Sequence, residues 1–372
     1  MTTDSDPFAW TGAVLAQKYR IEEVVGQGGF GVVHKAFHLG FGVPVAVKFL
    51  KIPPEIRGEE RARFEQGFIE EGRLLHQLSR SCAAIVQALD VGTAESPNGT
   101  WTPYLVLEWL EGQTLEQYLD QRRASAFGSL SLNDAILLLE PAARALDFAH
   151  GEGVAHRDVK PANLFLTTGG PYPTLKILDF GIAKVMTGNS SLTKAFLQTG
   201  RSIRAFSPGY GTPEQFNPEF GATGPWTDVF ALALVFVELL TSQPALRGRD
   251  TTELYVQVTD AQRRPTARAR GSFVSDEVEQ VLSKALAVDP RARYFRCGQF
   301  WDALLLAVQR AGSGSVVPAV QASGAPLLET KTVAVTHSQD ARIAGAPTKP
   351  EQPRHGLPAR AWFLRTGCAP PS

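Results

Sequence analysis

The sequence is poor in cysteine and in long apolar runs. Its 372 residues include three cysteines, Cys82, Cys297 and Cys368, which are far apart and odd in number. They have neither metal-ligand spacing nor the pattern of a disulfide framework, so we expect a reducing, cytoplasmic environment. No run of about 18 unbroken apolar residues is present, so we expect no membrane span. The most apolar long segment, VFALALVFVELL, is short enough to be a buried helix.

The sequence also lacks an excess of charge and a secretion signal. Lys+Arg and Asp+Glu both number 37, which argues against a nucleic-acid partner. The first residues, MTTDSDPFAWTG, have neither a basic region nor an apolar region, so we expect no signal peptide. A hydrophobic content of 44% in a chain of this length is enough for a sizeable core.

The pattern of apolar residues divides the chain into four parts. Residues 1–18 are predicted to be a loose lead-in, and 19–109 a small strand-rich lobe with one main helix near 61–78. Residues 110–311 read as a larger, mostly helical lobe. Periodicity fades over 312–372, which predicts a flexible tail.

The first motif is glycine-rich and lies between two strand patterns. In GQGGFGVV, Gly26, Gly28 and Gly31 have the form G-x-G-x-x-G, with Gln27 and Gly29 in the same loop. A dinucleotide fingerprint requires a helix directly after the glycines, whereas a β-branched run follows here. We interpret the loop as a phosphate cradle, because glycine permits close backbone approach and unusual dihedral angles. A plain glycine-rich hairpin turn is the alternative.

A lysine follows the glycine loop at the end of an alternating strand, VAVK. Lys48 can extend its ammonium beneath the loop to meet phosphate oxygens. An acidic partner on the next helix is needed to hold it, and Glu71 is preferred over Glu70 because Leu75 and Leu78 follow it on the same helical edge. The alternative is that both glutamates are simply solvated.

Two further segments contain the residue types that phosphoryl transfer requires. In HRDVKPANLF, Asp158 can serve as the base, Lys160 can neutralise the transferring phosphate, and Asn163 offers an oxygen to Mg²⁺. In LKILDFG, Asp179 follows an apolar strand and offers a second metal ligand. A solvated turn would explain the polarity of the first segment but not its order.

Taken in series, these motifs resemble the signature set of the eukaryotic-type (Hanks-type) protein kinases. The resemblance covers about Tyr19 to Gly312 and implies an α+β, bilobal protein-kinase fold. It also implies an adenine site. Leu107 would gate its back pocket, and the backbones of Glu108 and Leu110 would bind the ring. The residues that would sandwich the ring are Val33, Ala46 and Phe165. Leu75, His156 and Phe180 would belong to a stacked apolar column.

The resemblance implies further structural partners in the helical lobe. Glu214, in TPEQF, would form a buried ion pair with Arg293, for which Arg291 is the alternative. Ser207 would bridge the base and Lys160, and Asp228 would anchor the catalytic loop. Two departures from the family pattern stand near these residues: Thr212 occupies the usual alanine position, and ALA replaces the usual Ser-Leu-Gly after Asp228, where we expect altered packing.

By resemblance, the function is ATP-dependent transfer to Ser/Thr hydroxyls of protein substrates by a bacterial kinase, with Mg²⁺ and alternatively Mn²⁺. Arg157 would bind a phosphate on the activation segment, which holds Thr187, Ser190, Ser191, Thr193, Thr199 and Ser202. Autophosphorylation there, through self-association of two chains, is a further expectation. A small-molecule phosphotransferase and a non-catalytic scaffold on the same fold are the rival functions.

Overall fold

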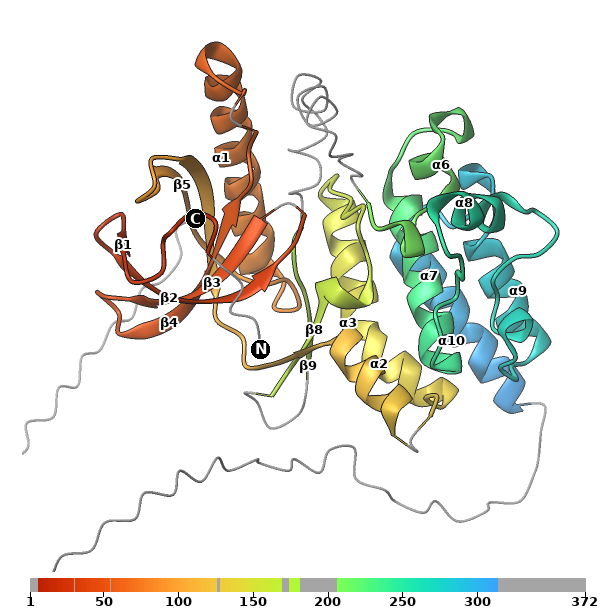
Figure 1. Ribbon diagram of the computed structural model, residues 1–372. Helices are drawn as coiled ribbons and strands as arrows, with labels where there is room; N and C mark the ends of the chain where they lie inside the picture. Colours follow the sequence, from red (N-terminus) through yellow and green to blue (C-terminus); the bar gives the residue numbers. More distant parts are fainter. Residues whose placement is uncertain are drawn as a thin grey trace, which may run out of the picture. The chain divides into compact units, whose positions relative to one another are not determined.

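The computed structural model describes residues 6–29, 31–53, 55–125, 128–168, 174–180 and 206–313. These residues, all within the compact unit 1–316, form a sheet lobe and a helical lobe (Figure 1). The predicted division into a strand-rich and a helical lobe is therefore confirmed. No helix among the described residues is long and apolar enough to cross a membrane.

The N-terminal lobe is built on a six-stranded antiparallel sheet. Its strands are β1 (Val14–Leu15), β2 (Tyr19–Gln27), β3 (Gly31–His38), β4 (Val43–Leu50), β5 (Ala88–Glu95) and β6 (Trp101–Glu108), in the spatial order β1-β2-β3-β4-β6-β5. Successive side chains of a strand point to opposite faces. Along β4, Val45, Val47 and Phe49 belong to a core on one face, whereas Leu50 belongs to the core on the other.

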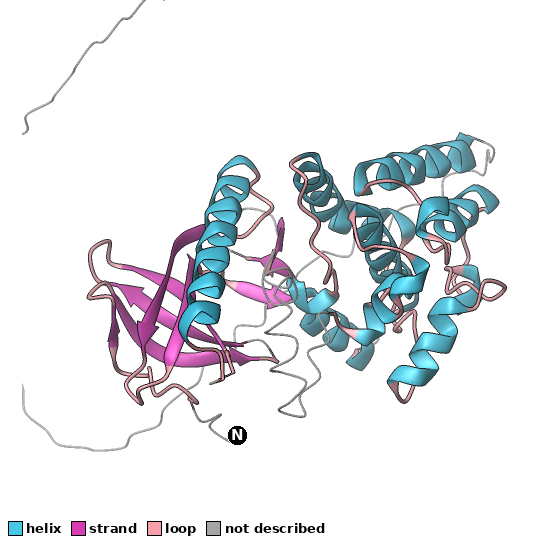
Figure 2. Ribbon diagram, turned by 90° about the horizontal axis from the view of Figure 1, so that it is seen from above, coloured by secondary structure: helices cyan, strands magenta, loops and turns pink. Residues whose placement is uncertain are grey.

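One long helix, α1 (Gly58–Ser81), packs against β5 and β6. Figure 2 shows it lying across the sheet. Its buried edge includes Phe64, Phe68, Leu75 and Leu78, spaced as the sequence predicts for an amphipathic helix. The helix extends three residues beyond the predicted 61–78 at each end.

A small sheet and a set of helices make up the second lobe. The strands are β7 (Gly112–Thr114), β8 (Leu164–Thr167) and β9 (Thr174–Ile177). The α-helices are α2 (Leu115–Ala124), α3 (Leu132–Gly151), α6 (Pro213–Phe216), α7 (Pro225–Thr241), α8 (Thr251–Thr259), α9 (Asp276–Ala285) and α10 (Cys297–Ser313). Short 3₁₀ turns are η1 (Pro161–Asn163), η2 (Pro208–Tyr210), η3 (Pro218–Phe220), η4 (Arg268–Arg270) and η5 (Pro290–Ala292).

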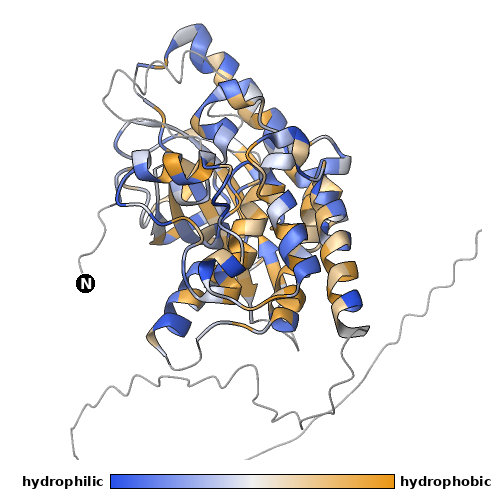
Figure 3. Ribbon diagram, turned by 90° about the vertical axis from the view of Figure 1, so that its right-hand side faces the viewer, coloured by the Kyte–Doolittle hydropathy of each residue, from blue (hydrophilic) through white to orange (hydrophobic). Residues whose placement is uncertain are grey.

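Local sequence explains several of these helices. Thr114 caps α2 and forms a capping box with Gln117, which satisfies backbone N–H groups at the start of this helix. The α3 helix runs through Pro141 as one continuous helix, although proline within a helix removes a backbone hydrogen bond. The α7 helix is apolar on all sides and almost wholly buried, as predicted, whereas in α9 only Val278, Leu282 and Ala285 are buried. Figure 3 shows hydrophobic and hydrophilic residues side by side on helices of this lobe.

The prediction of a loose lead-in over residues 1–18 is wrong for the described part, 6–18. Phe8, Trp10 and Leu15 are buried against the sheet, and β1 pairs with β2. The segment makes these contacts with isolated apolar residues separated by turns, so it has no periodicity that a sequence pattern could reveal.

Candidate active site

Asp158 lies in the loop between α3 and η1, and three groups bind its carboxylate. Lys160 Nζ donates to Oδ2 at 2.8 Å, and Asn163 Nδ2 donates to the same oxygen at 3.1 Å. The backbone N–H of Ser207 donates to Oδ1 at 3.1 Å, while the Ser207 hydroxyl accepts from Lys160 Nζ at 2.6 Å. The bridge between Asp158, Lys160 and Ser207 that the resemblance implies is therefore present.

Asn163 is oriented by the same loop. Its Nδ2 also donates to the backbone carbonyl of Asp158 at 2.8 Å, so both amide hydrogens are directed toward Asp158. The side-chain oxygen of Asn163 is thus the atom left to face a cation. The backbone carbonyl of Asn163 accepts from Leu178 N at 2.8 Å, which links this loop to the residue just before Asp179.

Asp228, on α7, holds the start of the loop that contains Asp158. Its two carboxylate oxygens accept from the backbone N–H groups of His156 and Arg157, both at 2.7 Å. His150 Nε2 donates to it at 2.8 Å, because His150 Nδ1 accepts from Cys297 N. Burial alone would raise the pKa of Asp228, but these hydrogen bonds and the neighbouring histidines lower it below its usual value. The implied anchoring role of Asp228 is confirmed.

His156 connects the catalytic loop to the segment that ends in Asp179. Its Nδ1 accepts from Asp158 N at 3.2 Å, so Nε2 bears the proton and donates to the carbonyl of Leu178 at 2.7 Å. Its ring meets the buried ring of Phe180 edge to face at 4.7 Å. Leu75 belongs to the same large core as Phe180, while the stacked column of Leu75, His156 and Phe180 stays a prediction.

Arg157 adopts an unusual backbone conformation, with φ of 65°. Its carbonyl accepts from Gln215 Nε2 at 2.7 Å, so both backbone groups are held in place. The side-chain Nε is buried and makes no hydrogen bond in the described part of the chain. The residues expected to be phosphorylated, within 187–202, lie outside the described residues.

Lys48 and Asp179 form an ion pair of 2.7 Å between Nζ and Oδ1. Lys48 is nearly buried, while Asp179 is about one-third exposed. Burial raises the pKa of Asp179, but the charge and hydrogen bond of Lys48 outweigh it and hold the pKa below its usual value. The expected pairing of Lys48 with Glu71 is not the one observed, because Asp179, and not Glu71 of α1, lies within ion-pair distance of the ammonium. Glu71 is half-buried on α1.

The glycine-rich loop is a closed hairpin between β2 and β3. Gly28 N–H donates to Gly31 O at 2.9 Å, and Lys51 Nζ binds the carbonyl of Gly28. Gly26, Gly28 and Gly29 do not adopt a positive φ, so the left-handed freedom of glycine is not used at these three positions. At Gly31 a side chain is excluded by lack of space, because an added Cβ would lie 2.3 Å from the carbonyl oxygen of Phe49. Around Gly28 and Gly29 the space is open.

The segment expected to bind adenine lies at the end of β6. The N–H of Glu108 donates to Gln87 O at 3.0 Å, and its carboxylate binds Lys176 on β9. Leu107 is buried and pairs with Ala46 across the β4–β6 ladder. Ala46 and Val33 lie on the same face of the sheet as Lys48, since Val33 is paired with Lys48. Leu110 and Phe165 are half-buried.

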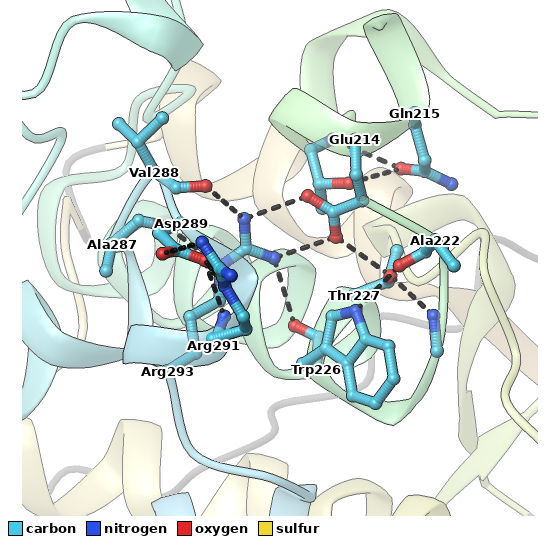
Figure 4. Close-up of polar contacts among 12 residues, drawn as sticks. Glu214, Gln215, Ala222, Trp226, Thr227, Ala287, Val288, Asp289, Arg291 and Arg293 are labelled. Atoms are coloured by element: carbon cyan, nitrogen blue, oxygen red, sulfur yellow. Dashed lines mark hydrogen bonds and ion pairs between the residues drawn. The ribbon is translucent and has the colours of Figure 1, made fainter. Parts of the chain in front are cut away.

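A buried ion pair joins the end of the activation segment to the last third of the chain. Arg293 binds both carboxylate oxygens of Glu214, at 2.8 and 2.9 Å, and neither side chain is exposed (Figure 4). Thr227 also donates to Glu214 at 2.9 Å. The predicted pair with Arg293 is confirmed, while the alternative, Arg291, binds Asp289 at the surface.

A further buried carboxylate, Glu238, was not predicted from the sequence. Glu238 on α7 is 1% exposed, accepts from the hydroxyl of Tyr210 at 2.5 Å, and forms an ion pair with Arg123 of α2. Burial raises the pKa of Glu238 despite these partners. Tyr210 lies three residues after Ser207, so this cluster holds the segment that contacts Asp158. The sequence does hold one sign of this buried carboxylate, since Glu238 is the single charged residue between positions 229 and 246.

Comparison with known proteins agrees with this geometry. Residues 19–298 match the model of the protein kinase domain, so the chain belongs to the protein kinase family. It is 33% identical over 283 residues to "Serine/threonine-protein kinase PknB" of Mycolicibacterium smegmatis, covering 75% of this chain and 41% of the relative. The probable serine/threonine-protein kinase PknB of Corynebacterium glutamicum is 32% identical over 292 residues, covering 76% and 41%.

A solved structure supports the fold. The PknI kinase domain of Mycobacterium tuberculosis has a TM-score of 0.53 and 24% identity, covering 80% of this chain and 98% of that one. The predicted bilobal kinase fold is therefore confirmed. The chain spans about two-fifths of the length of the curated relatives.

Proposed function

We propose that this protein transfers the γ-phosphoryl group of ATP to serine or threonine hydroxyls of other proteins. The observation that carries the proposal is the arrangement around Asp158, whose carboxylate is held by Lys160, Asn163 and Ser207. A carboxylate fixed in this way can orient an incoming hydroxyl and accept its proton. Lys160 lies beside it as the positive charge that neutralises the transferred phosphoryl group. The serine/threonine-protein kinases among the relatives support this substrate class.

The nucleotide would lie between the sheet and β8. In this proposal, Gly26, Gln27, Gly28 and Gly29 would cover its phosphates, and Gly31 would support the hairpin. Lys48 would bind the phosphates from the side of the sheet.

The adenine ring would lie at the end of β6. Because the N–H of Glu108 is already bonded to Gln87, the carbonyl of Glu108 would face adenine, together with the backbone N–H of Leu110. Val33, Ala46 and Phe165 would enclose the ring, and Leu107 would limit the depth of the pocket. Glu71 would stabilise Lys48 from α1 once the phosphates are bound.

The residues present fit a divalent cation. Asn163 directs its amide hydrogens toward Asp158 and leaves its oxygen free for a metal, and Asp179 offers a carboxylate whose lowered pKa keeps it ionised. Two oxygen donors suit Mg²⁺, which keeps several waters and binds substrate phosphates; Mn²⁺ accepts the same donors. When bound, the ion would neutralise charge on the phosphate oxygens.

Regulation by phosphorylation is a further part of the proposal. The buried Nε of Arg157 lacks a hydrogen-bond partner among the described residues, and a guanidinium is well suited to bind a phosphate. We infer that one or more of Thr193, Thr199 and Ser202 is phosphorylated by a second copy of the chain. Mass spectrometry after incubation with Mg-ATP tests this, and the absence of phosphate from residues 187–207 would contradict it.

The cytoplasmic location and the flexible tail over 312–372 also stay predictions.

Comparison of the wild type with Asp158→Asn tests the main proposal. The expected result is transfer from Mg-ATP to a generic basic protein by the wild type and a loss of about 10²- to 10⁴-fold in the variant. Glu152→Gln, which removes an exposed carboxylate at the end of α3, serves as the control and should keep full activity. Nucleotide binding without transfer by the wild type would favour the scaffold, and transfer to a small molecule alone would favour the small-molecule phosphotransferase.

A further inference from the structure

The segment Asp6–Leu15 covers the face of the N-terminal sheet that points away from Lys48. It precedes residue 19, where the match to the protein kinase domain begins. Phe8, Trp10 and Leu15 are 6%, 4% and 0% exposed, and they complete a second apolar core with residues of β2, β3, β4 and β6. We call this segment the N-terminal cover.

The cover is centred on Phe49. The Trp10 ring stacks on the Phe49 ring, with centroids 5.2 Å apart and an interplanar angle of 4°. Phe8 lies at 6.2 Å from the same ring, and His34 meets it edge to face at 5.2 Å. Three aromatic side chains from two other segments therefore hold Phe49 in place.

Phe49 is the residue directly after Lys48 on β4. Because successive side chains of a strand point to opposite faces, Phe49 points into the cover while Lys48 points toward Asp179. The backbone carbonyl of Phe49 is also the atom against which Gly31 packs. One strand position thus joins the cover, the lysine and the base of the glycine hairpin.

The cover is fastened to the lobe by polar contacts at both ends. The Asp6 carboxylate accepts from Phe8 N at 3.0 Å and from Thr11 N at 2.7 Å, which closes a turn around Trp10. The same carboxylate lies 3.1 Å from Nε2 of the fully buried His34 on β3. At the other end, Gly12 N–H donates to Ile21 O at 3.0 Å and β1 pairs with β2.

We propose that the N-terminal cover is a positioning element of the nucleotide site, in which Trp10 fixes the backbone of β4 through Phe49 and thereby the reach of Lys48. The inference rests on the proposed kinase function. Trp10 acts through another residue and touches no substrate, so it is a positioning residue. Its buried Nε1 makes no hydrogen bond in the described part of the chain, so the ring alone supplies the contact.

The test is carried out on the full chain with Mg-ADP as the probe, by calorimetric titration, and with KM for ATP and kcat measured separately. Trp10→Ala should weaken Mg-ADP binding and raise KM for ATP by about tenfold, the scale of one aromatic pair, with a smaller change in kcat. Trp10→Phe keeps a ring and loses no hydrogen bond, so it should restore most of the affinity. If the alanine variant does not fold, Trp10→Leu takes its place. It keeps apolar volume without the ring stacking and should likewise weaken Mg-ADP binding.

Trp301→Phe is the matched control. Trp301 is fully buried in the helical lobe against Phe236 and Phe300, so its replacement should lower the melting temperature without changing the affinity for Mg-ADP. Folded Trp10→Ala or Trp10→Leu variants that bind Mg-ADP as the wild type does would overturn the positioning role. A wild type that binds no adenine nucleotide would instead overturn the proposed function, and the positioning role with it.

Discussion

Lys48 Nζ and Asp179 Oδ1 lie 2.7 Å apart, and this ion pair connects β4 of the sheet lobe to a carboxylate two residues beyond the end of β9. The sequence separates the two by 131 positions, and the intervening chain brings them together through the Ile85–Ile177 bridge between the lobes. Because Lys48 is nearly buried, its positive charge acts strongly on the Asp179 carboxylate. The pair therefore defines the point at which phosphate and metal would meet.

The charge of Asp179 is the subject of the first prediction. Asp179→Asn keeps the size of the side chain and removes its charge, so phosphoryl transfer should fall by about 10²- to 10³-fold. Steady-state rates with Mg-ATP measure this. Asp302→Asn, which changes an exposed carboxylate on α10, should keep the wild-type rate. An unchanged rate in Asp179→Asn would remove Asp179 from the proposed metal site.

The ion pair between Glu214 and Arg293 gives a stability prediction with an internal control. Arg293→Met leaves the buried Glu214 without its cation and should lower the free energy of unfolding by about 3–5 kcal/mol. Arg291→Met, two residues earlier, removes only an exposed pair with Asp289 and should change it by about 0.5 kcal/mol or less. Urea unfolding of both variants provides the measurement, and equal losses would contradict the assignment.

Much of the site could be predicted because its residues lie at fixed offsets within short segments. Asp158, Lys160 and Asn163 converge because one tight loop and η1 separate them. The choice of Arg293 over Arg291 was open in the sequence, and burial decided it. The partner of Lys48 could not be predicted from residues near it in the sequence, since it depends on how α1 and the end of β9 approach β4.

The misses have a common physical origin. The cover residues Phe8 and Trp10 are isolated apolar residues among turns, and only the tertiary fold shows that a sheet face is available to bury them. Glu238 was overlooked because a single acid in an apolar helix has no local partner, and its partners Tyr210 and Arg123 come from distant segments. The β5 strand has weak alternation and was not predicted.

Gly31 and Gly28 provide a paired test of the glycine hairpin. Gly31→Ala would place a Cβ 2.3 Å from Phe49 O, so the backbone must shift at an expected cost of about 1–3 kcal/mol in unfolding free energy. Gly28→Ala meets nothing within 4 Å and should fold as the wild type, within about 0.5 kcal/mol. Thermal and urea unfolding distinguish them. A destabilised Gly28→Ala beside an unaffected Gly31→Ala would show that the hairpin packs differently.

The buried His34 predicts a loss of stability in mild acid. Burial lowers its pKa from the ordinary value of 6.5, and the Asp6 carboxylate only partly offsets this. The unfolded chain therefore takes up a proton near pH 6.5 while folded His34 does not, so stability is present above this pH and is lost as the pH falls below it. Each pH unit in which only the unfolded state is protonated lowers the unfolding free energy by about 1.4 kcal/mol.

Asp6 adds to this effect only at lower pH. Burial raises the pKa of Asp6, but its hydrogen bonds with Phe8 and Thr11 and the adjacent His34 ring outweigh burial and lower the pKa below the usual 3.8, so its contribution is lost as the pH falls below about 3.8. A comparison of unfolding free energies at pH 7.5 and 5.5 isolates His34. His34→Phe should show a smaller decrease than the wild type, because an apolar ring at this position takes up no proton in either state. Equal decreases in the two proteins would assign the acid sensitivity to other groups.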